Sequence, residues 1–272
     1  MKRYSFVILT LTVSILFLIS SCATGIKQAE DAPVDNTLKI IEGGKLYDQW
    51  WVVVKGAEEP KLNQPLWSLQ STNKRSGSDT WRCKECHGWD YLGNEGAYSS
   101  GSHKTGFAGV FQIQKMSLKD IEAILLGSKN PFHNFSYVMD YDAINNLAIF
   151  LKEGLIDDRI YIDYNTKAPF NADTKNGKVL YEKMCLKCHG ADGTELNFGT
   201  DQSPEYVGTL AVSNPWELVH KIRFGQPGSI MPALRLRLKL SEKENKMPSG
   251  IETGYTMQDV MDIVRYSQTL PK

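Results

Sequence analysis

Residues 177–190 read GKVLYEKMCLKCHG, and this stretch decides how the second half of the chain folds. Its apolar residues recur at helical spacing, which predicts a helix with one apolar face. The helix leads directly into the pentapeptide CLKCH at residues 185–189. A pentapeptide of the same form, CKECH, lies at residues 83–87. The chain therefore carries the pattern C-x-x-C-H twice, once in each half.

Both pentapeptides have the spacing of covalent c-type haem attachment. Two thiols three residues apart on one helical turn can reach the two vinyl groups of a haem, and the next His then lies below the iron as its proximal ligand. The sequence thus predicts two covalently bound haem c groups. The predicted attachment residues are Cys83, Cys86, Cys185 and Cys188, and the predicted proximal ligands are His87 and His189.

Other uses of paired cysteines explain the pattern less well. A zinc site built from two C-x-x-C pairs usually separates them by about 15–20 residues, whereas Cys86 and Cys185 lie 99 positions apart. Two disulfides would not account for the His that follows each pair. A thioredoxin-like motif would need a strand–helix–strand context, which the sequence lacks. Covalent haem is the interpretation that explains all three residues of each motif.

The second half resembles a class I cytochrome c domain, whose first helix runs into its haem site. The triplet Met231-Pro232-Ala233 lies between a helix expected at about residues 215–224 and a last helix expected at residues 257–270. It is similar to the distal ligand loop of that family, which implies that Met231 is the sixth ligand of the second iron. A thioether ligand raises the reduction potential. Arg223 is a candidate partner of a haem propionate, because a guanidinium matches a carboxylate.

The first half departs from this plan. Its opening helix, expected at about residues 44–54, is separated from Cys83 by a stretch rich in Pro and Trp. A weak internal repeat still relates residues 44–48 to residues 177–182. Asp140 can cap a helix that resembles the last helix of the same fold. We therefore expect a diverged version of the same domain.

The sixth ligand of the first iron has several candidates. If Asp140 occupies the usual cap of the last helix, His133 lies seven residues earlier, where the family has its ligand Met. Met139 lies almost against the cap, and His103 lies closer to the first motif; an open sixth position is a further alternative. The favoured expectation is a first haem with two His ligands and a lower potential than the His/Met second haem.

The N-terminus has the features of an export signal. Lys2 and Arg3 precede an apolar run at residues 6–19, which is too short to span a bilayer, where about 20 residues are needed. The run ends in Ile19-Ser20-Ser21-Cys22, which resembles the lipobox of bacterial lipoproteins and implies lipidation at Cys22. Ala23 rather than Asp after the cysteine favours the outer membrane if the host is Gram-negative. We expect an exported lipoprotein that faces the periplasm.

The predicted fold class is mainly α, with two cytochrome c-like helical domains in tandem. The expected organisation is a signal peptide at 1–21, a tether at 22–39, a first domain at 40–156, a linker at 157–172 and a second domain at 173–272.

Composition limits the function further. The chain has 31 Lys and Arg against 31 Asp and Glu, so it lacks the basic excess of a nucleic-acid binder. The resemblance implies one-electron transfer between redox partner proteins that the sequence does not name, with the membrane reached through the lipid anchor. The alternative is a dihaem oxidoreductase, peroxidase-like or thiosulfate dehydrogenase-like, with a catalytic first haem. Thiosulfate dehydrogenases of this layout use a distal Cys, and no cysteine remains beyond Cys22 and the four in the motifs. The sequence favours an electron-transfer protein over a catalyst.

Overall fold

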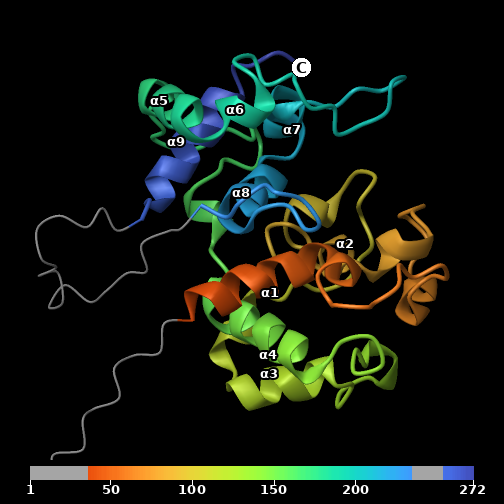
Figure 1. Cartoon of the computed structure of the whole chain (residues 1–272). Helices are drawn as coiled ribbons and strands as arrows, with labels where there is room; N and C mark the ends of the chain where they lie inside the picture. The colour runs from red at the N-terminus through yellow and green to blue at the C-terminus, as the bar shows by residue number, and fades with distance from the viewer. Residues whose placement is uncertain (1–35, 235–253) are drawn as a thin grey trace, which may run out of the picture. The chain divides into compact units, whose positions relative to one another are not determined.

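Two pairs of packed helices organise the chain (Figure 1). The computed structural model describes residues 36–234 and 254–272, which belong to one compact unit, Asp35–Lys272. In the first half, up to residue 172, helix α1 (Thr37–Gln49) packs against α4 (Tyr141–Ile149). In the second half, from residue 173, α5 (Thr174–Met184) packs against α9 (Met257–Ser267). The predicted signal peptide, Cys22, residues 23–35 of the tether and residues 235–253 lie outside the described part.

Short helices and turns complete the described chain, and the mainly α fold class is confirmed. The other α-helices are α2 (Cys83–His87), α3 (Leu118–Leu125), α6 (Leu186–His189), α7 (Val207–Ser213) and α8 (Pro215–Phe224). Most of the remaining elements are single 3-10 turns, among them η6 (Pro131–His133), and a π-helical turn, η7 (Phe150–Gly154), extends α4. In the described residues the only β pairing is a set of isolated bridges. None of the described helices has the length and apolar character needed to cross a bilayer.

Local signals in the sequence explain where several helices begin. Asp140 caps α4 as predicted, because its Oδ1 accepts a hydrogen bond from the backbone N–H of Ala143 at 2.8 Å. Asp173 caps α5 in the same way. Thr256 and Asp259 form a reciprocal capping box at the start of α9. Helix α8 begins at Pro215, where the missing N–H has no intrahelical partner to lose.

The first helix begins earlier than predicted. It starts at Thr37 rather than near residue 44, and Gly43 and Gly44 lie inside it. A side chain at Gly43 would collide with the backbone carbonyl of Asn146 on α4, and one at Gly44 would collide with the ring of Phe224 on α8. The two glycines therefore continue the helix and permit close approach by two neighbouring helices, instead of marking its beginning.

The internal repeat is genuine but shifted by one residue. Gly177 on α5 meets the carbonyl of Asp262 on α9, just as Gly43 meets that of Asn146 on α4. Tyr47 and Tyr181 lie four residues after these glycines. The structural equivalent of Gly177 is therefore Gly43, not Gly44 as the sequence comparison implied.

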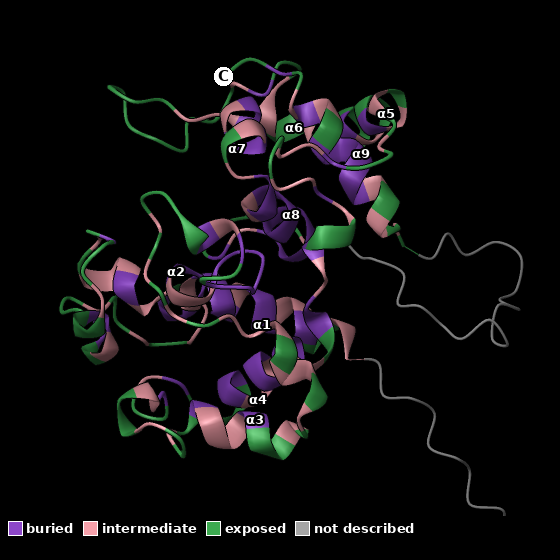
Figure 2. Cartoon of the chain, turned by 180° about the vertical axis from the view of Figure 1, so that it is seen from behind, coloured by how far each residue is buried: buried purple, intermediate pink, exposed green. Residues whose placement is uncertain are grey.

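Helix α8 lies at the centre of the buried interior. Figure 2 shows it as almost wholly buried, and only Glu217 of its ten residues is not in the buried class. His220 on this helix is neutral and fully hydrogen-bonded: its Nε2 donates to the carbonyl of Gly44 at 2.9 Å, and its Nδ1 accepts from Tyr91 Oη at 3.0 Å. Burial lowers the pKa of His220 to about 3. It is therefore a structural residue that joins α8 to the first half.

The segment predicted as a linker is folded against its surroundings. Asp158 and Ile162 are buried, Ile162 pairs with Pro169, and Tyr164 Oη donates to Asp90 Oδ2 at 3.0 Å. Residues 157–172 therefore connect the two halves without being a free tether.

Two candidate haem cavities

The first cavity gathers the residues of the first motif around an apolar space of about 230 Å³. Cys83, Cys86 and His87 come from α2, and His133 comes from η6 across the cavity. The imidazole centres of His87 and His133 lie 6.3 Å apart, and their ring planes cross at 75°. Two residues separated by 46 positions in the sequence thus line the same cavity, with their rings nearly perpendicular.

The hydrogen bonds of these two histidines orient one nitrogen of each towards the cavity. His87 Nδ1 donates to the carbonyl of Ala108 at 2.7 Å, and His133 Nδ1 lies 3.5 Å from the carbonyl of Ile124. Nε2 is then the nitrogen of each ring that is left to bind a metal. Two metal–nitrogen bonds of about 2.0 Å, with roughly 1 Å from each nitrogen to its ring centre, require a centre-to-centre distance of about 6 Å. The observed spacing fits an iron held between the two imidazoles.

Burial keeps the groups of this cavity neutral. Desolvation lowers the pKa of His87 to about 4, and it also lowers the pKa of His133. A neutral imidazole is the form that binds a metal. Desolvation raises the pKa of Cys83 and of Cys86 to about 12, so neither thiol is a ready thiolate. This suits cysteines that form thioethers and disfavours a thiolate metal site or a nucleophile here.

The two other candidate ligands of the first iron lie elsewhere. Met139 is buried in the apolar core of the first half and does not line the first cavity. His103 is held by charged neighbours, with Nδ1 donating to Glu85 Oε1 at 2.8 Å and Nε2 accepting from Arg75 Nη2 at 2.9 Å. Its ring also stacks on Tyr98. Of the three candidates, the structure brings only His133 to the first cavity.

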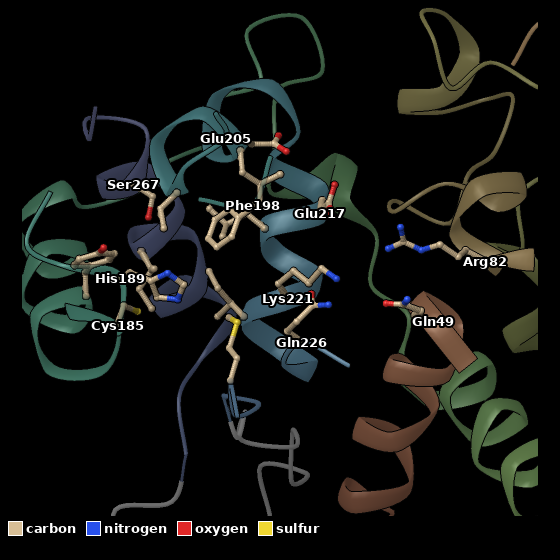
Figure 3. Close-up of a pocket in the computed structure, with 17 residues that line it drawn as sticks. Gln49, Arg82, Cys185, His189, Phe198, Glu205, Glu217, Lys221, Gln226 and Ser267 are labelled. Atoms are coloured by element: carbon tan, nitrogen blue, oxygen red, sulfur yellow. The ribbon is translucent and has the colours of Figure 1, made fainter. Parts of the chain in front are cut away.

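The second cavity has a volume of about 510 Å³ and brings Cys185, His189 and Met231 together. Figure 3 shows the imidazole of His189 inside it, opposite α8. The apolar side chains of Leu218, Ile222 and Ile263 also line the cavity, as expected for a site that receives a large flat cofactor. This is the pair of iron ligands predicted for the second half.

Both cavities are open to solvent to a similar degree, and the residues around the second include exposed ones. Cys188 is exposed, Met231 is half-buried, and the neighbouring Ile230 is 93% exposed. Within the described residues, His189 Nδ1 is buried without a hydrogen-bond partner, and burial lowers the pKa of this imidazole. A neutral imidazole with an unpartnered nitrogen is suited to bind a metal, so these residues also fit a haem.

A tyrosine on the first helix of each half holds the turn after each motif. Tyr47 Oη donates to the carbonyl of Gly88 at 2.7 Å, and Tyr181 Oη donates to that of Gly190 at 3.0 Å. Both glycines have positive φ, of 82° and 77°, which allows the chain to turn sharply after the His. Sequence reasoning missed this role, although the repeat contains both tyrosines.

Arg223 lines neither cavity. It is buried, and its Nη2 donates to the carbonyl of Gly154 at 2.7 Å. Lys221 lines the second cavity instead, because residues two positions apart on a helix point to opposite sides. Arg82, the residue before Cys83, lines both cavities. The predicted propionate contact at Arg223 is therefore not supported. The basic side chains that line the second cavity are those of Arg82 and Lys221.

Residues 172–247 match the model of the family described as cytochrome c oxidase, cbb3-type, subunit III. A cytochrome c domain lies there. Such a domain implies covalently bound haem c and haem-based electron transfer, and supports a c-type cytochrome. The match covers the second motif and Met231. Comparison with curated proteins and with solved structures gave no match.

Proposed function

We propose that this chain is an exported, membrane-anchored dihaem c-type cytochrome that passes single electrons between redox partner proteins. In the first half Cys83 and Cys86 would hold one haem, with His87 and His133 as its iron ligands. In the second half Cys185 and Cys188 would hold the other, with His189 and Met231 as ligands. The observation that carries the proposal is the pair His87 and His133, whose 6.3 Å ring separation suits an iron between them.

Bound haem supplies one-electron chemistry, in which a donor loses one electron as ferric iron becomes ferrous, and an acceptor gains it in the reverse step. The residues of this chain tune that chemistry. Two neutral imidazoles at the first iron favour the ferric state, and the thioether of Met231 at the second iron favours the ferrous state. The second haem would therefore have the higher reduction potential and would be the first of the two to be reduced.

A catalytic first haem would need an open or easily released ligand position. His133 lies on a 3-10 turn whose start is fixed by Asn130, which accepts a hydrogen bond from the N–H of Phe132 at 3.0 Å. Its Nδ1 also faces a backbone carbonyl. These contacts, which hold His133 in place, favour a six-coordinate first iron. They therefore favour an electron carrier over a dihaem oxidoreductase.

The membrane-anchored part of the proposal rests on the sequence of residues 1–22. The apolar run and the Ile19-Ser20-Ser21-Cys22 ending support export and lipidation. Cys22→Ser should release the protein from membranes into the soluble fraction while leaving haem attachment intact. Retention of this variant in the membrane fraction would contradict the anchor.

Haem stoichiometry tests the dihaem part. The protein is produced with a haem attachment system, and covalent haem is quantified per chain for the wild type, for Cys83→Ala/Cys86→Ala and for Cys185→Ala/Cys188→Ala. We expect two haems in the wild type and one in each double variant. One haem in the wild type, with no loss in the first double variant, would refute the proposal for the first half.

A further inference from the structure

A cluster of charged side chains includes Arg82, which lines both cavities. It consists of Asp48 on α1, Arg82 just before the first motif, and Lys221 on α8. Asp48 binds both cations: its Oδ1 pairs with Arg82 Nη2 and its Oδ2 with Lys221 Nζ. Arg82 Nε also donates to the backbone carbonyl of Asp48 at 3.0 Å. These contacts join the first half of the chain to the second.

The cluster is buried and remains charged. The side chain of Asp48 is 0% exposed, that of Lys221 is 9% exposed, and that of Arg82 is 19% exposed. Burial alone would raise the pKa of Asp48, but Lys221 and Arg82 outweigh it and lower that pKa to about 2. Removing charges from water is costly unless they are paired. A buried carboxylate with two cations is therefore a feature that the fold maintains against a cost.

The position of the cations relates the cluster to both cavities. Arg82 lines the first cavity and the second, and Lys221 lines the second. Figure 3 shows Arg82 and Gln49 approaching the second cavity from the first half of the chain. The charge of Asp48 also contributes to the raised pKa of Cys83 in the first cavity. One charge cluster thus acts on the surroundings of both cavities.

Three further groups lie near the two cations of the cluster. Asp79 Oδ1 lies 3.7 Å from Arg82 Nη1, but its side chain is 50% exposed. Burial lowers the pKa of Lys221, and Asp48, together with Glu217 that lines the second cavity, opposes this shift. The ring of Trp89 lies 5.1 Å from Lys221 Nζ and 5.8 Å from the guanidinium of Arg82, which holds both cations from a third side. In the part of the chain that the structure describes, the buried carboxylate in contact with both Arg82 and Lys221 is that of Asp48.

The cluster is not a general feature of the repeat. Glu182 occupies the position on α5 that Asp48 occupies on α1, one residue after the equivalent tyrosine. The side chain of Glu182 is 49% exposed, and its nearest cation is Lys178 at 3.7 Å on the same helix. Only the first half directs this acidic residue inward, towards the other half.

We propose that Arg82 and Lys221 bind the propionates of the haem in the second cavity, and that the cluster which they form with Asp48 sets the potentials of both haems together. This inference rests on the proposed dihaem function. The cations favour ferrous iron, since reduction lowers the positive charge at the iron, and Asp48 reduces that effect at both sites. A change in the cluster therefore shifts the reduction potentials of both haems, whereas a change in a single iron ligand shifts the potential of one haem.

The test is a spectroelectrochemical titration of the purified, haem-loaded full chain. Lys221→Gln removes a cation that lines the second cavity but not the first. Its control is Lys39→Gln, at an exposed position near the start of α1. We expect the potential of the second haem to fall, with an approximately tenfold change in its ferric–ferrous equilibrium, about 59 mV for one electron. The first haem should shift less.

Asp48→Asn is the second variant, with Asp142→Asn at an exposed position of α4 as its control. We expect both potentials to rise relative to that control. Shifts no larger than those of the control variants would overturn the inference, as would a shift of one haem only in Asp48→Asn. If Asp48→Asn yields no haem-loaded protein, Lys221→Gln decides alone. Haem is counted in the same samples: a single haem refutes the proposed function, whereas two haems with unmoved potentials refute only the cluster's role.

Discussion

The two halves of the molecule share a frame, which consists of the crossing of their first and last helices and the turn after the motif. They differ at the distal side of the cavity. Each has a glycine where its first helix crosses its last, Gly43 and Gly177, and a tyrosine that holds the turn after its motif. In the first half a His on a 3-10 turn closes the cavity. In the second half the distal candidate is Met231, which lies in a loop and, like His133, is half-buried.

This difference shows which parts of the fold are free to change. The crossing of the helices and the turn after the motif hold the proximal side, so they keep the same residue types in both halves. The distal side needs only one ligand at the right distance from the proximal His. A different ligand there changes the potential without changing the frame.

The largest expected effect comes from removing the distal ligand of the first half. His133→Ala should convert the first iron from low spin to high spin and allow carbon monoxide to bind after reduction. Electron paramagnetic resonance and visible spectra measure both changes. Met139→Leu is the control, because this volume-conserving core substitution should cost less than about 1.5 kcal/mol and leave the spectra unchanged. Spectral loss in Met139→Leu but not in His133→Ala would exchange the two assignments.

The next largest effect is expected from a substitution that gives both irons the same pair of ligands. Met231→His should give the second iron two His ligands and lower its potential towards that of the first, by more than the ~59 mV of a tenfold change. Spectroelectrochemistry measures the two potentials. Met184→Leu, close to the same motif on α5, should leave both unchanged. An unchanged second potential in Met231→His would show that Met231 is not a ligand.

Substitution of the crossing glycines tests the shared frame. Gly177→Val and Gly43→Val should each destabilise the protein by about 1–3 kcal/mol or more, because the new side chain meets a backbone carbonyl of the opposite helix. Thermal unfolding should show melting temperatures lower by several degrees. Lys178→Ala, exposed beside Gly177, is the control and should change little. Melting temperatures equal to that control would mean that the crossings are not as close as described.

The smallest effect concerns the contact between the halves at His220. The pKa of this buried imidazole is lowered to about 3, whereas an unfolded His has a pKa near 6.5. Between these values the unfolded chain binds the extra proton, so stability is complete above about pH 6.5 and falls as the pH decreases. The free energy of unfolding should fall by up to about 1.4 kcal/mol per pH unit from this residue. Denaturant titrations at pH 4 to 7 measure it, and His220→Gln should show a smaller slope; an equal slope would assign the effect to other groups.

Much of the fold could be predicted from local signals. The bounds of α8, the cap of α4 at Asp140 and the start of α9 at Met257 follow from caps and apolar periodicity. The start of α1 could not be predicted, because its two glycines are explained only by the helices that approach them. The same reason explains the one-residue shift of the repeat.

The candidate sites were predictable where chemistry fixes the spacing. The C-x-x-C-H motifs place three residues on one turn, so the sequence alone indicates them. The roles of Arg82, Lys221 and Asp48 could not be found in this way, since the three lie 34 and 139 positions apart along the chain. Arg223 and Lys221 are both basic residues near the end of α8, and only the packing of that helix decides which one faces the second cavity.

Low-temperature electron paramagnetic resonance, combined with visible spectra, tests most directly whether this chain holds two irons with different ligand pairs. The sample is the purified, haem-loaded protein, first oxidised in air and then reduced under carbon monoxide. We expect two low-spin ferric signals. The signal of the first half should be strongly anisotropic, because imidazole planes crossed at 75° leave two iron d orbitals nearly equal in energy. Visible absorption spectra recorded after reduction under carbon monoxide should show no shift in the bands of the first haem. A high-spin ferric signal or a carbon monoxide complex at the first haem would contradict this expectation.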